Sequence, residues 1–270
     1  MANLSESVVG IIGGGSMGGA IARGLVESGV MAAEHVLVAD PDTSKREGFE
    51  AIGITTYENG PEMLGATPDV IVLAVKPQVI VSVMSEIAPQ VVDRLVISIA
   101  AGVTIATVEG TLSGARVVRV MPNLPAQVRS GATAIAPGPT ATKEDAELAR
   151  ELFGALGAAV IMTEAQLDVS GAVVGTAPAF FALFIDTLTR AGVRAGMPAA
   201  DCRVLLETTM RGCAEQLLEE GVHPREYMER VTSPGGTTAA ALHELECPLI
   251  EASDAAVQAA LDRTRELAGD

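Results

Sequence analysis

A short group of small and hydroxylated residues near the carboxyl end of the sequence has the composition of an anion-binding turn. Residues 233–238 read Ser-Pro-Gly-Gly-Thr-Thr, and the alanine- and leucine-rich run after them favours a helix that begins at Thr237. The first N–H groups of a helix have no partner inside it, and the helix dipole adds partial positive charge there. Such a turn suits a small carboxylate, with the hydroxyls of Thr237 and Thr238 available to a neighbouring ligand atom. The alternative is that a threonine caps the helix and the glycines only form the turn.

A second group of residues with chemical potential lies near the amino end. Gly13, Gly15 and Gly18 form the pattern Gly-x-Gly-x-x-Gly, after an apolar run at 8–12 and before an amphipathic segment at 20–28. In a strand–turn–helix context, the first glycine permits a tight turn and the second lets a pyrophosphate approach the backbone. The third lets helix and strand pack closely. We therefore predict a dinucleotide-binding site, the alternative being a glycine-rich turn without a ligand.

The residues after the next expected strand bear on the choice between NAD and NADP. Asp40 closes the run 35–39, where a carboxylate would hydrogen-bond the adenosine ribose and favour NAD. The segment 41–46 that follows supplies hydroxyls and the cations Lys45 and Arg46, which suit a 2′-phosphate. Asp40 is equally placed to be the N-cap of the next helix. The cofactor therefore stays open between NADPH and NADH.

Two further turns follow strands and face the expected crevice. Lys76 comes directly after the apolar run 69–75, and the carboxyl ends of such strands border the cofactor site. Its alternative role is a solvated loop charge. Ala100, Ala101 and Gly102 follow the run 95–99, where a larger side chain would obstruct a nicotinamide ring. Their alternative role is a tight strand–helix turn.

The elements that must position these residues alternate between strands and helices over about 160 residues, which predicts an α/β fold with a doubly wound sheet. The expected strands are 8–12, 35–39, 54–56, 69–75, 95–99, 116–120, 131–136 and 158–162. The expected helices are 20–28, 45–51, 78–90, 104–109 and 142–156. Loops are expected at 59–61 and 121–125, the second fixed by two prolines.

From residue 164 onward helical patterns dominate, so we place a domain boundary after 163. The prediction is a Rossmann-like dinucleotide-binding domain at 1–163 and an all-helical substrate-binding and dimerisation domain at 164–270. Helices are expected from 179, at 199–220, from 237 and at 249–267. The helix that opens at 179 is apolar on nearly every face, which indicates burial between subunits.

Composition excludes several classes of function. Lys and Arg total 18 against 34 Asp and Glu, and the net charge of −16 opposes binding to nucleic acid or to anionic membranes. Three cysteines (202, 213 and 247) and three distant histidines lack metal-binding spacing, so we expect no metal and reduced thiols in the cytoplasm. We expect no signal peptide, and no membrane span because Lys76 or Asp186 interrupts the longest apolar stretches.

Taken together, the motifs resemble those of the pyrroline-5-carboxylate reductase family over nearly the whole chain. In chain order they are Gly13-x-Gly15-x-x-Gly18, Ala74-Val-Lys76-Pro77, Ala100-Ala-Gly-Val-Thr104, Met121-Pro-Asn-x-Pro125, Gly175-x-x-Pro178-Ala179 and Ser233-Pro-Gly-Gly-x-Thr238. The last of these is the most specific, since few other dinucleotide enzymes carry it. The resemblance implies NAD(P)H-dependent reduction of 1-pyrroline-5-carboxylate to L-proline, the last step of proline biosynthesis, in a homo-oligomer built on a dimer.

The resemblance also implies site residues by position. The cofactor would contact Gly13, Gly15, Ser16, Met17, Gly18, Asp40, Lys45, Asn59, Ala74, Val75, Lys76, Pro77, Ala100, Ala101 and Gly102. The substrate carboxylate would be held by Ser233, Gly235, Gly236 and Thr237. Thr238 would hydrogen-bond the ring nitrogen as the catalytic residue. The active site would lie between the cofactor of one subunit and helices that include the partner's.

One departure from the family pattern and two rival functions remain. The family's usual Gly-Ser-Gly-Pro-Ala reads Gly-Thr-Ala-Pro-Ala at 175–179, so Thr176 keeps a hydroxyl while Ala177 adds a methyl group. A β-hydroxyacid dehydrogenase would need a Lys or His acid–base group early in the C-terminal helices, and 164–222 contains neither. A regulatory protein that binds the cofactor without turnover is the second rival.

Overall fold

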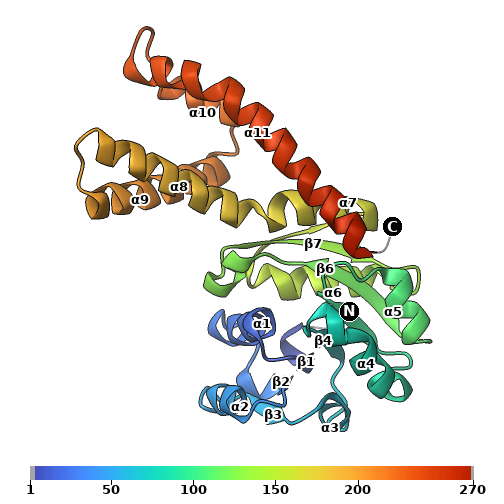
Figure 1. Ribbon diagram of the computed structural model, residues 1–270. Helices are drawn as coiled ribbons and strands as arrows, with labels where there is room; N and C mark the ends of the chain where they lie inside the picture. Colours follow the sequence, from blue (N-terminus) through green and yellow to red (C-terminus); the bar gives the residue numbers. More distant parts are fainter. Residues whose placement is uncertain (1–3, 269–270) are drawn as a thin grey trace. The chain divides into compact units, whose positions relative to one another are not determined.

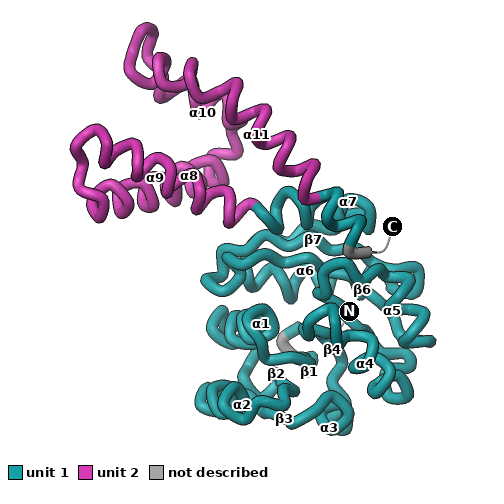
Figure 2. Tube along the Cα trace, in the orientation of Figure 1, with its two compact units in different colours: residues 1–176, 261–270 teal, residues 177–260 magenta. Residues whose placement is uncertain are grey.

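The computed structural model describes residues 4–268 and divides into two compact units. Unit 1 comprises residues 1–176 and 261–270, and unit 2 comprises 177–260 (Figure 2). This grouping by contact differs from the predicted cut after residue 163. The division into domains at 1–163 and 164–270 therefore stays a prediction. Each unit is described by itself.

Unit 1 is built on one eight-stranded sheet in the order β3-β2-β1-β4-β5-β6-β7-β8. The strands are β1 (Val9–Ile12), β2 (Val36–Ala39), β3 (Thr55–Tyr57), β4 (Val70–Leu73), β5 (Leu95–Ser98), β6 (Arg116–Met121), β7 (Gly131–Pro137) and β8 (Gly157–Ile161). All pairs are parallel except β6 with β7. The strand order reverses between β1 and β4, where doubly wound sheets place their ligands. This topology confirms the predicted Rossmann-like fold.

Helices cover both faces of this sheet (Figure 1). One face packs against α1 (Ser16–Glu27), α2 (Thr43–Glu50) and α6 (Lys143–Gly154). The other packs against α3 (Gly60–Leu64), α4 (Pro77–Ile87), α5 (Ile105–Thr111) and α7 (Glu164–Ser170). Successive residues of a strand lie in opposite cores. Ile11 is buried on the face that α1, α2 and α6 cover, and Ile12 on the other face. Burial on both faces explains why these strands are continuous apolar runs.

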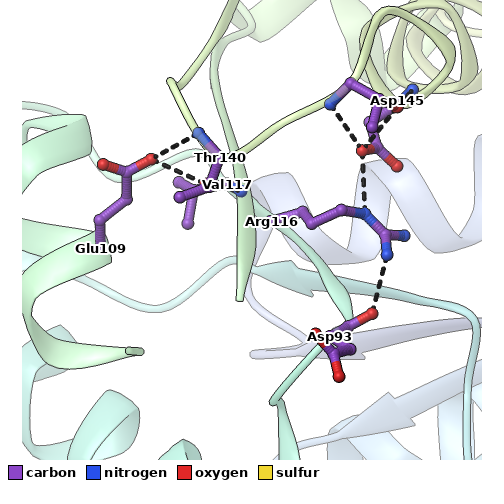
Figure 3. Close-up of polar contacts among 7 residues, drawn as sticks. Asp93, Glu109, Arg116, Val117, Thr140 and Asp145 are labelled. Atoms are coloured by element: carbon purple, nitrogen blue, oxygen red, sulfur yellow. Dashed lines mark hydrogen bonds and ion pairs between the residues drawn. The ribbon is translucent and has the colours of Figure 1, made fainter. Parts of the chain in front are cut away.

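Arg116 at the start of β6 joins three parts of unit 1 through its guanidinium group (Figure 3). Its Nε donates to Asp145 of α6 at 2.9 Å, and its Nη1 donates to the carbonyl of Asp93, in the turn before β5, at 2.8 Å. Asp145 also accepts from the backbone N–H and the hydroxyl of Thr142, which completes a capping box at the start of α6. The same carboxylate therefore starts the helix and attaches it to the sheet.

Unit 2 is entirely helical and has almost no core of its own. It contains α8 (Ala177–Arg194), α9 (Ala199–Glu220), α10 (Pro224–Arg230) and most of α11 (Thr237–Ala268). Within 177–260 only Thr189 and Cys202 are buried. Large apolar side chains are exposed instead, with Phe181 at 57%, Leu183 at 61% and Leu218 at 82%. Most of the apolar surface of α8 is thus left uncovered within its own unit.

Length and composition alone would allow the helical segment Glu164–Arg194 to cross a membrane. It has 31 residues and a mean hydropathy of 1.6, and only 6% of its most apolar window is buried in this single chain. The sequence prediction that Asp186 interrupts this stretch therefore does not exclude a span. A helix covered by a second copy of the chain has the same composition. The absence of a membrane partner stays a prediction.

Several predicted element limits were wrong. α1 begins at Ser16 rather than at residue 20, and the predicted loop at 59–61 is the start of α3, with Asn59 as N-cap and a proline in the first turn. The proline-rich segment after β6 includes a 3₁₀ turn at Leu124–Val128. α11 runs unbroken through Pro248, where two helices were expected. The helix expected at 199–220 is α9, with the same limits, and Gly221 closes it at φ 64°.

Candidate cofactor and substrate site

The glycine loop after β1 is held by contacts that leave no room for side chains at two of its glycines. The N–H of Gly13 donates to the carbonyl of Ala39 at 2.8 Å, which ties the loop to the end of β2. Gly13 has φ +106°, and a Cβ there would lie 2.7 Å from the carbonyl oxygen of Ala74. A Cβ on Gly18 would collide with the carbonyl oxygen of Gly13. The first and third glycines therefore serve the packing of strand against helix.

Gly15 differs, because a Cβ built on it meets no atom within 4 Å. It is the N-cap residue of α1, no side chain caps this helix, and no acid lies in its first turn. The first-turn N–H groups, which include those of Ser16, Met17 and Gly18, have no partner inside the helix. Open space beside unpartnered backbone donors and a helix dipole fits the diphosphate of a dinucleotide.

A cavity of about 350 Å³ opens beside this loop. Its lining residues are Gly14, Gly15, Ser16, Gly19, Ala20, Arg23, Gly24, Glu27, Ser44, Lys45, Gly48, Phe49 and Gln127. Gln127 donates to the Ser16 hydroxyl at 2.7 Å, and the Arg23 guanidinium lies 4.8 Å from the centre of the Phe49 ring. No local pattern points to Gln127, because 111 residues separate it from Ser16.

Asp40 is buried behind the glycine loop and is already bound by the protein. Its carboxylate accepts from the N–H of Gly14 at 2.8 Å, from the N–H of Asp42 at 3.0 Å and from the Lys45 ammonium at 3.2 Å. The interpretation that Asp40 caps the next helix is wrong, since Asp42 is the N-cap of α2 and accepts from the Ser44 N–H. The hydrogen bond from the Ser44 hydroxyl lowers the pKa of Asp42 below its usual value.

The small-residue turns after β4 and β5 lie beside the same loop. A Cβ on Gly13 would come within 3.0 Å of Val75, which follows Ala74 at the end of β4. Lys76 is the exposed N-cap residue of α4, and Pro77 is in its first turn. After β5, Ala100 is buried, Ala101 is exposed and Gly102 has φ +73°. The structure thus brings the predicted nicotinamide-side residues to the carboxyl edge of β1, β4 and β5.

Asn59 occupies a different local role from the one implied by the resemblance. Its side chain accepts from the backbone N–H of Glu62 at 3.0 Å and so caps α3. The residue follows β3 at the same edge of the sheet, and Asp40 N–H donates to the carbonyl of Tyr57 at 3.1 Å nearby. A contact of Asn59 with adenosine stays a prediction.

In unit 2, the segment 233–238 forms the turn and helix start that the sequence predicted. Gly235 has φ +71°, the N–H of Gly236 donates to the carbonyl of Ser233 at 3.0 Å, and α11 begins at Thr237. Thr237 is exposed and Thr238 is half-buried. Within residues 4–268 the Thr238 hydroxyl has no hydrogen-bond partner, whereas Thr208 of α9 donates to the carbonyl of Val204 at 2.8 Å. This segment, residues 233–238, forms a cradle that exposes backbone N–H donors and the available hydroxyl of Thr238.

A buried charge network that the sequence analysis missed lies beside the turn after β5. Arg119 of β6 is 2% exposed and donates to Glu164 at 2.9 Å and to Asp168 at 2.8 Å, both on α7. Glu164 also accepts from the N–H of Ile105 at 2.7 Å, at the start of α5. The signal in the sequence was a second arginine inside the expected strand 116–120, between Val118 and Val120. The network fixes α5 and α7 on the sheet.

A doubly wound sheet with a glycine loop of this geometry at its reversal point defines a Rossmann-type dinucleotide-binding protein. Residues 8–102 match the family model for coenzyme F420-dependent NADP oxidoreductases, and residues 164–267 match that for pyrroline-5-carboxylate reductase dimerisation. The chain is 38% identical to a pyrroline-5-carboxylate reductase of Methanosarcina acetivorans, over 98% of this chain and 99% of that protein. The chain belongs to the pyrroline-5-carboxylate reductase family, which confirms the predicted family and the predicted oxidoreductase class.

Two solved structures agree with this assignment. A pyrroline-5-carboxylate reductase from Coxiella burnetii superimposes with a TM-score of 0.92 at 34% identity, covering 97% of this chain and 98% of that one. The Plasmodium falciparum pyrroline carboxylate reductase with NADP bound superimposes with a TM-score of 0.84 at 27% identity, covering 98% and 99%. The likeness therefore extends over both units of the chain.

Proposed function

We propose that this protein reduces the cyclic imine 1-pyrroline-5-carboxylate to L-proline with NADPH or NADH. The observation that carries the proposal is the cradle at the start of α11, with its Ser-Pro-Gly-Gly-Thr-Thr sequence and available donors. It lies in the segment that matches the reductase dimerisation family. A relative of nearly equal length bears the name of this reductase.

The cofactor half of the site belongs to unit 1. In this proposal the first-turn N–H groups after Gly15 bind the diphosphate, since that loop is open and uncapped. The adenosine side would contact Asp40, Lys45 and Asn59. The nicotinamide side would contact Ala74, Val75, Lys76, Pro77, Ala100, Ala101 and Gly102. When bound, the dinucleotide supplies the hydride.

The substrate half belongs to unit 2. Ser233, Gly235, Gly236 and Thr237 would hold the substrate carboxylate at the positive end of α11. The N–H groups of Gly235 and Thr237 would be the main donors, since that of Gly236 already donates to the Ser233 carbonyl. Thr238 would face the ring nitrogen. A protonated cyclic imine is already electrophilic at carbon, so the protein needs mainly to align that carbon with the hydride. After reduction the ring amine carries an N–H, and the Thr238 hydroxyl accepts a hydrogen bond from it.

A second copy of the chain completes unit 2 in this proposal. The uncovered apolar side chains of α8 and α9 require a partner surface, and the matching family model describes dimerisation. A homodimer in the cytoplasm, alone or as the building block of a larger oligomer, would cover the apolar surface of α8. No membrane is then needed to explain that surface. Ala177, where the family usually has glycine, lies at the start of this helix.

The reaction is tested by following the nicotinamide absorbance band with 1-pyrroline-5-carboxylate, using NADPH and NADH in parallel reactions. Loss of the reduced band together with formation of proline is the expected result. Oxidation of β-hydroxyacids by the oxidised cofactor, without any reduction of the imine, would favour a hydroxyacid dehydrogenase. Cofactor binding without turnover of the imine would favour a regulatory protein.

A further inference from the structure

We propose that Lys45 selects NADPH over NADH by neutralising Asp40 and presenting its ammonium group to the 2′-phosphate. This inference rests on the proposed function only in requiring a nicotinamide dinucleotide in the cavity beside the glycine loop. It assigns a direction to the choice that the sequence alone leaves open, because a carboxylate at the end of β2 would ordinarily indicate NAD.

The Asp40 carboxylate has no acceptor capacity left. A carboxylate has about four lone-pair sites. Oδ2 accepts from the N–H of Gly14 and from Lys45, and Oδ1 accepts from the N–H of Asp42 and from Lys45. The side chain of Asp40 is also only 6% exposed. A ribose 2′-hydroxyl would therefore have to displace Lys45 in order to reach this carboxylate.

The ammonium group of Lys45 is placed where a ligand in the cavity can reach it. Lys45 lines the same cavity as Gly14, Gly15 and Ser16, and 42% of its side chain is exposed. Its two bonds to Asp40 are both 3.2 Å, and an ammonium has three N–H donors, which leaves one for a ligand. The Asp40 charge is compensated by this pair, so it repels an incoming phosphate less than an unpaired carboxylate would.

The turn around the Asp40–Lys45 pair is held by hydrogen bonds and carries a second cation, Arg46. Arg46 donates from Nη1 to the carbonyl of Asp40 at 2.8 Å and from Nη2 to the Thr43 hydroxyl at 3.1 Å. Its guanidinium retains further donors. Ser44 adds no donor, since its hydroxyl already donates to Asp42 at 2.7 Å. Two cations on this turn match the needs of a phosphate monoester better than those of a ribose hydroxyl.

The test compares binding of 2′,5′-ADP, which carries the 2′-phosphate, with binding of 5′-AMP, which lacks it. Titration calorimetry on the full-length protein needs no imine, so a failure of the proposed reaction would not affect this measurement. We expect 2′,5′-ADP to bind at least about ten-fold more tightly than 5′-AMP, as a charge-assisted contact predicts. Lys45→Met should remove this preference without weakening 5′-AMP, and Lys45→Arg should retain it.

Lys143→Met is the matched control, since Lys143 begins α6 and does not line the cavity beside the glycine loop. It should bind both nucleotides as the unaltered protein does. Equal affinity of the unaltered protein for the two nucleotides would overturn the proposal. So would a Lys45→Met protein that keeps its preference for 2′,5′-ADP, or an unaltered protein that prefers 5′-AMP.

Discussion

The two units of this chain contain similar apolar residues but bury them to very different extents. In unit 1 the apolar runs are covered on both faces, so that Ile11 and Ile71 are 0% exposed. In unit 2 the large apolar side chains of α8 and α9 are mostly uncovered, and Leu183 is 61% exposed. Unit 1 thus has its core within one chain, whereas unit 2 has almost none, and in the proposed dimer a second chain would supply it. Burial, rather than composition, separates a self-contained fold from half of an interface.

The strongest way to break this comparison is to place a charge on each unit at a similarly exposed apolar position. Leu183→Asp should abolish assembly and nearly all reductase activity, because an interface would bury an unpaired carboxylate at a cost of several kcal/mol. Val81→Asp on α4 of unit 1, where valine is 53% exposed, should leave both unchanged. Sedimentation velocity and the imine assay measure the two effects. An intact oligomer of the Leu183→Asp protein would show that α8 is not the interface.

Within unit 1, two glycines of the same loop should separate folding from cofactor binding. Gly18→Ala should destabilise the protein by at least about 3 kcal/mol, because the new methyl group meets the backbone of Gly13. Gly15→Val should leave the free energy of unfolding nearly unchanged but weaken cofactor binding roughly a hundred-fold, since it fills the open side of the loop. Urea unfolding and calorimetric titration with the cofactor distinguish them. Unimpaired binding by Gly15→Val would contradict the diphosphate site.

In unit 2, the available hydroxyl of Thr238 should matter for the reaction and little for assembly. Thr238→Ala should lower kcat/KM roughly ten- to a hundred-fold while cofactor affinity stays the same, and Thr238→Ser should restore most of the loss. Thr208→Ala is the control, because that hydroxyl is satisfied by its own helix. An equal loss of cofactor affinity and kcat/KM would contradict a role confined to the substrate.

The smallest effect sharpens the comparison through protein concentration. Thr142→Ala removes the capping box of α6 and should cost about 1 kcal/mol. Because the core of unit 1 lies within one chain, the unfolding midpoint of the transition that reports on unit 1 should fall by the same amount at every protein concentration. The transition that reports on unit 2 should instead move with concentration. Chemical unfolding at several dilutions measures both, and a concentration-dependent Thr142→Ala effect would count against a self-contained unit 1.

The sequence predicted the parts of this molecule whose cause is local. The glycine pattern, the apolar strands and the helix at 199–220 follow from spacing within about 20 residues. The start of α3 was also readable, since Asn59 and Pro61 form an N-cap with a proline in the first turn, but the three residues were interpreted as a loop. The helices expected from 237 and at 249–267 are one helix, α11, which continues past Pro248.

The remaining features depend on contacts between distant segments, which no local pattern specifies. Arg119 finds its carboxylates 45 and 49 residues away, on α7. Asp40 accepts hydrogen bonds both from Gly14 in the glycine loop and from Lys45 in α2, and these bonds decide whether its carboxylate is available to a ligand. The candidate site was therefore predictable as a set of residues, but the donors and acceptors already in use were not.

The close approach of α8 and α9 has a consequence for how the molecule is made. A Cβ on Gly192 would come within 2.6 Å of the Cys202 sulfur, and Cys202 is one of the two buried residues of unit 2. Helices α8 and α9 thus pack closely near the turn that joins them, while most of their remaining apolar surface is uncovered. Refolding should show a first-order phase for the sheet and a later phase that quickens as more chains are present. At a low concentration of newly made chains, assembly of unit 2 should therefore be slower, while unit 1 should still fold correctly.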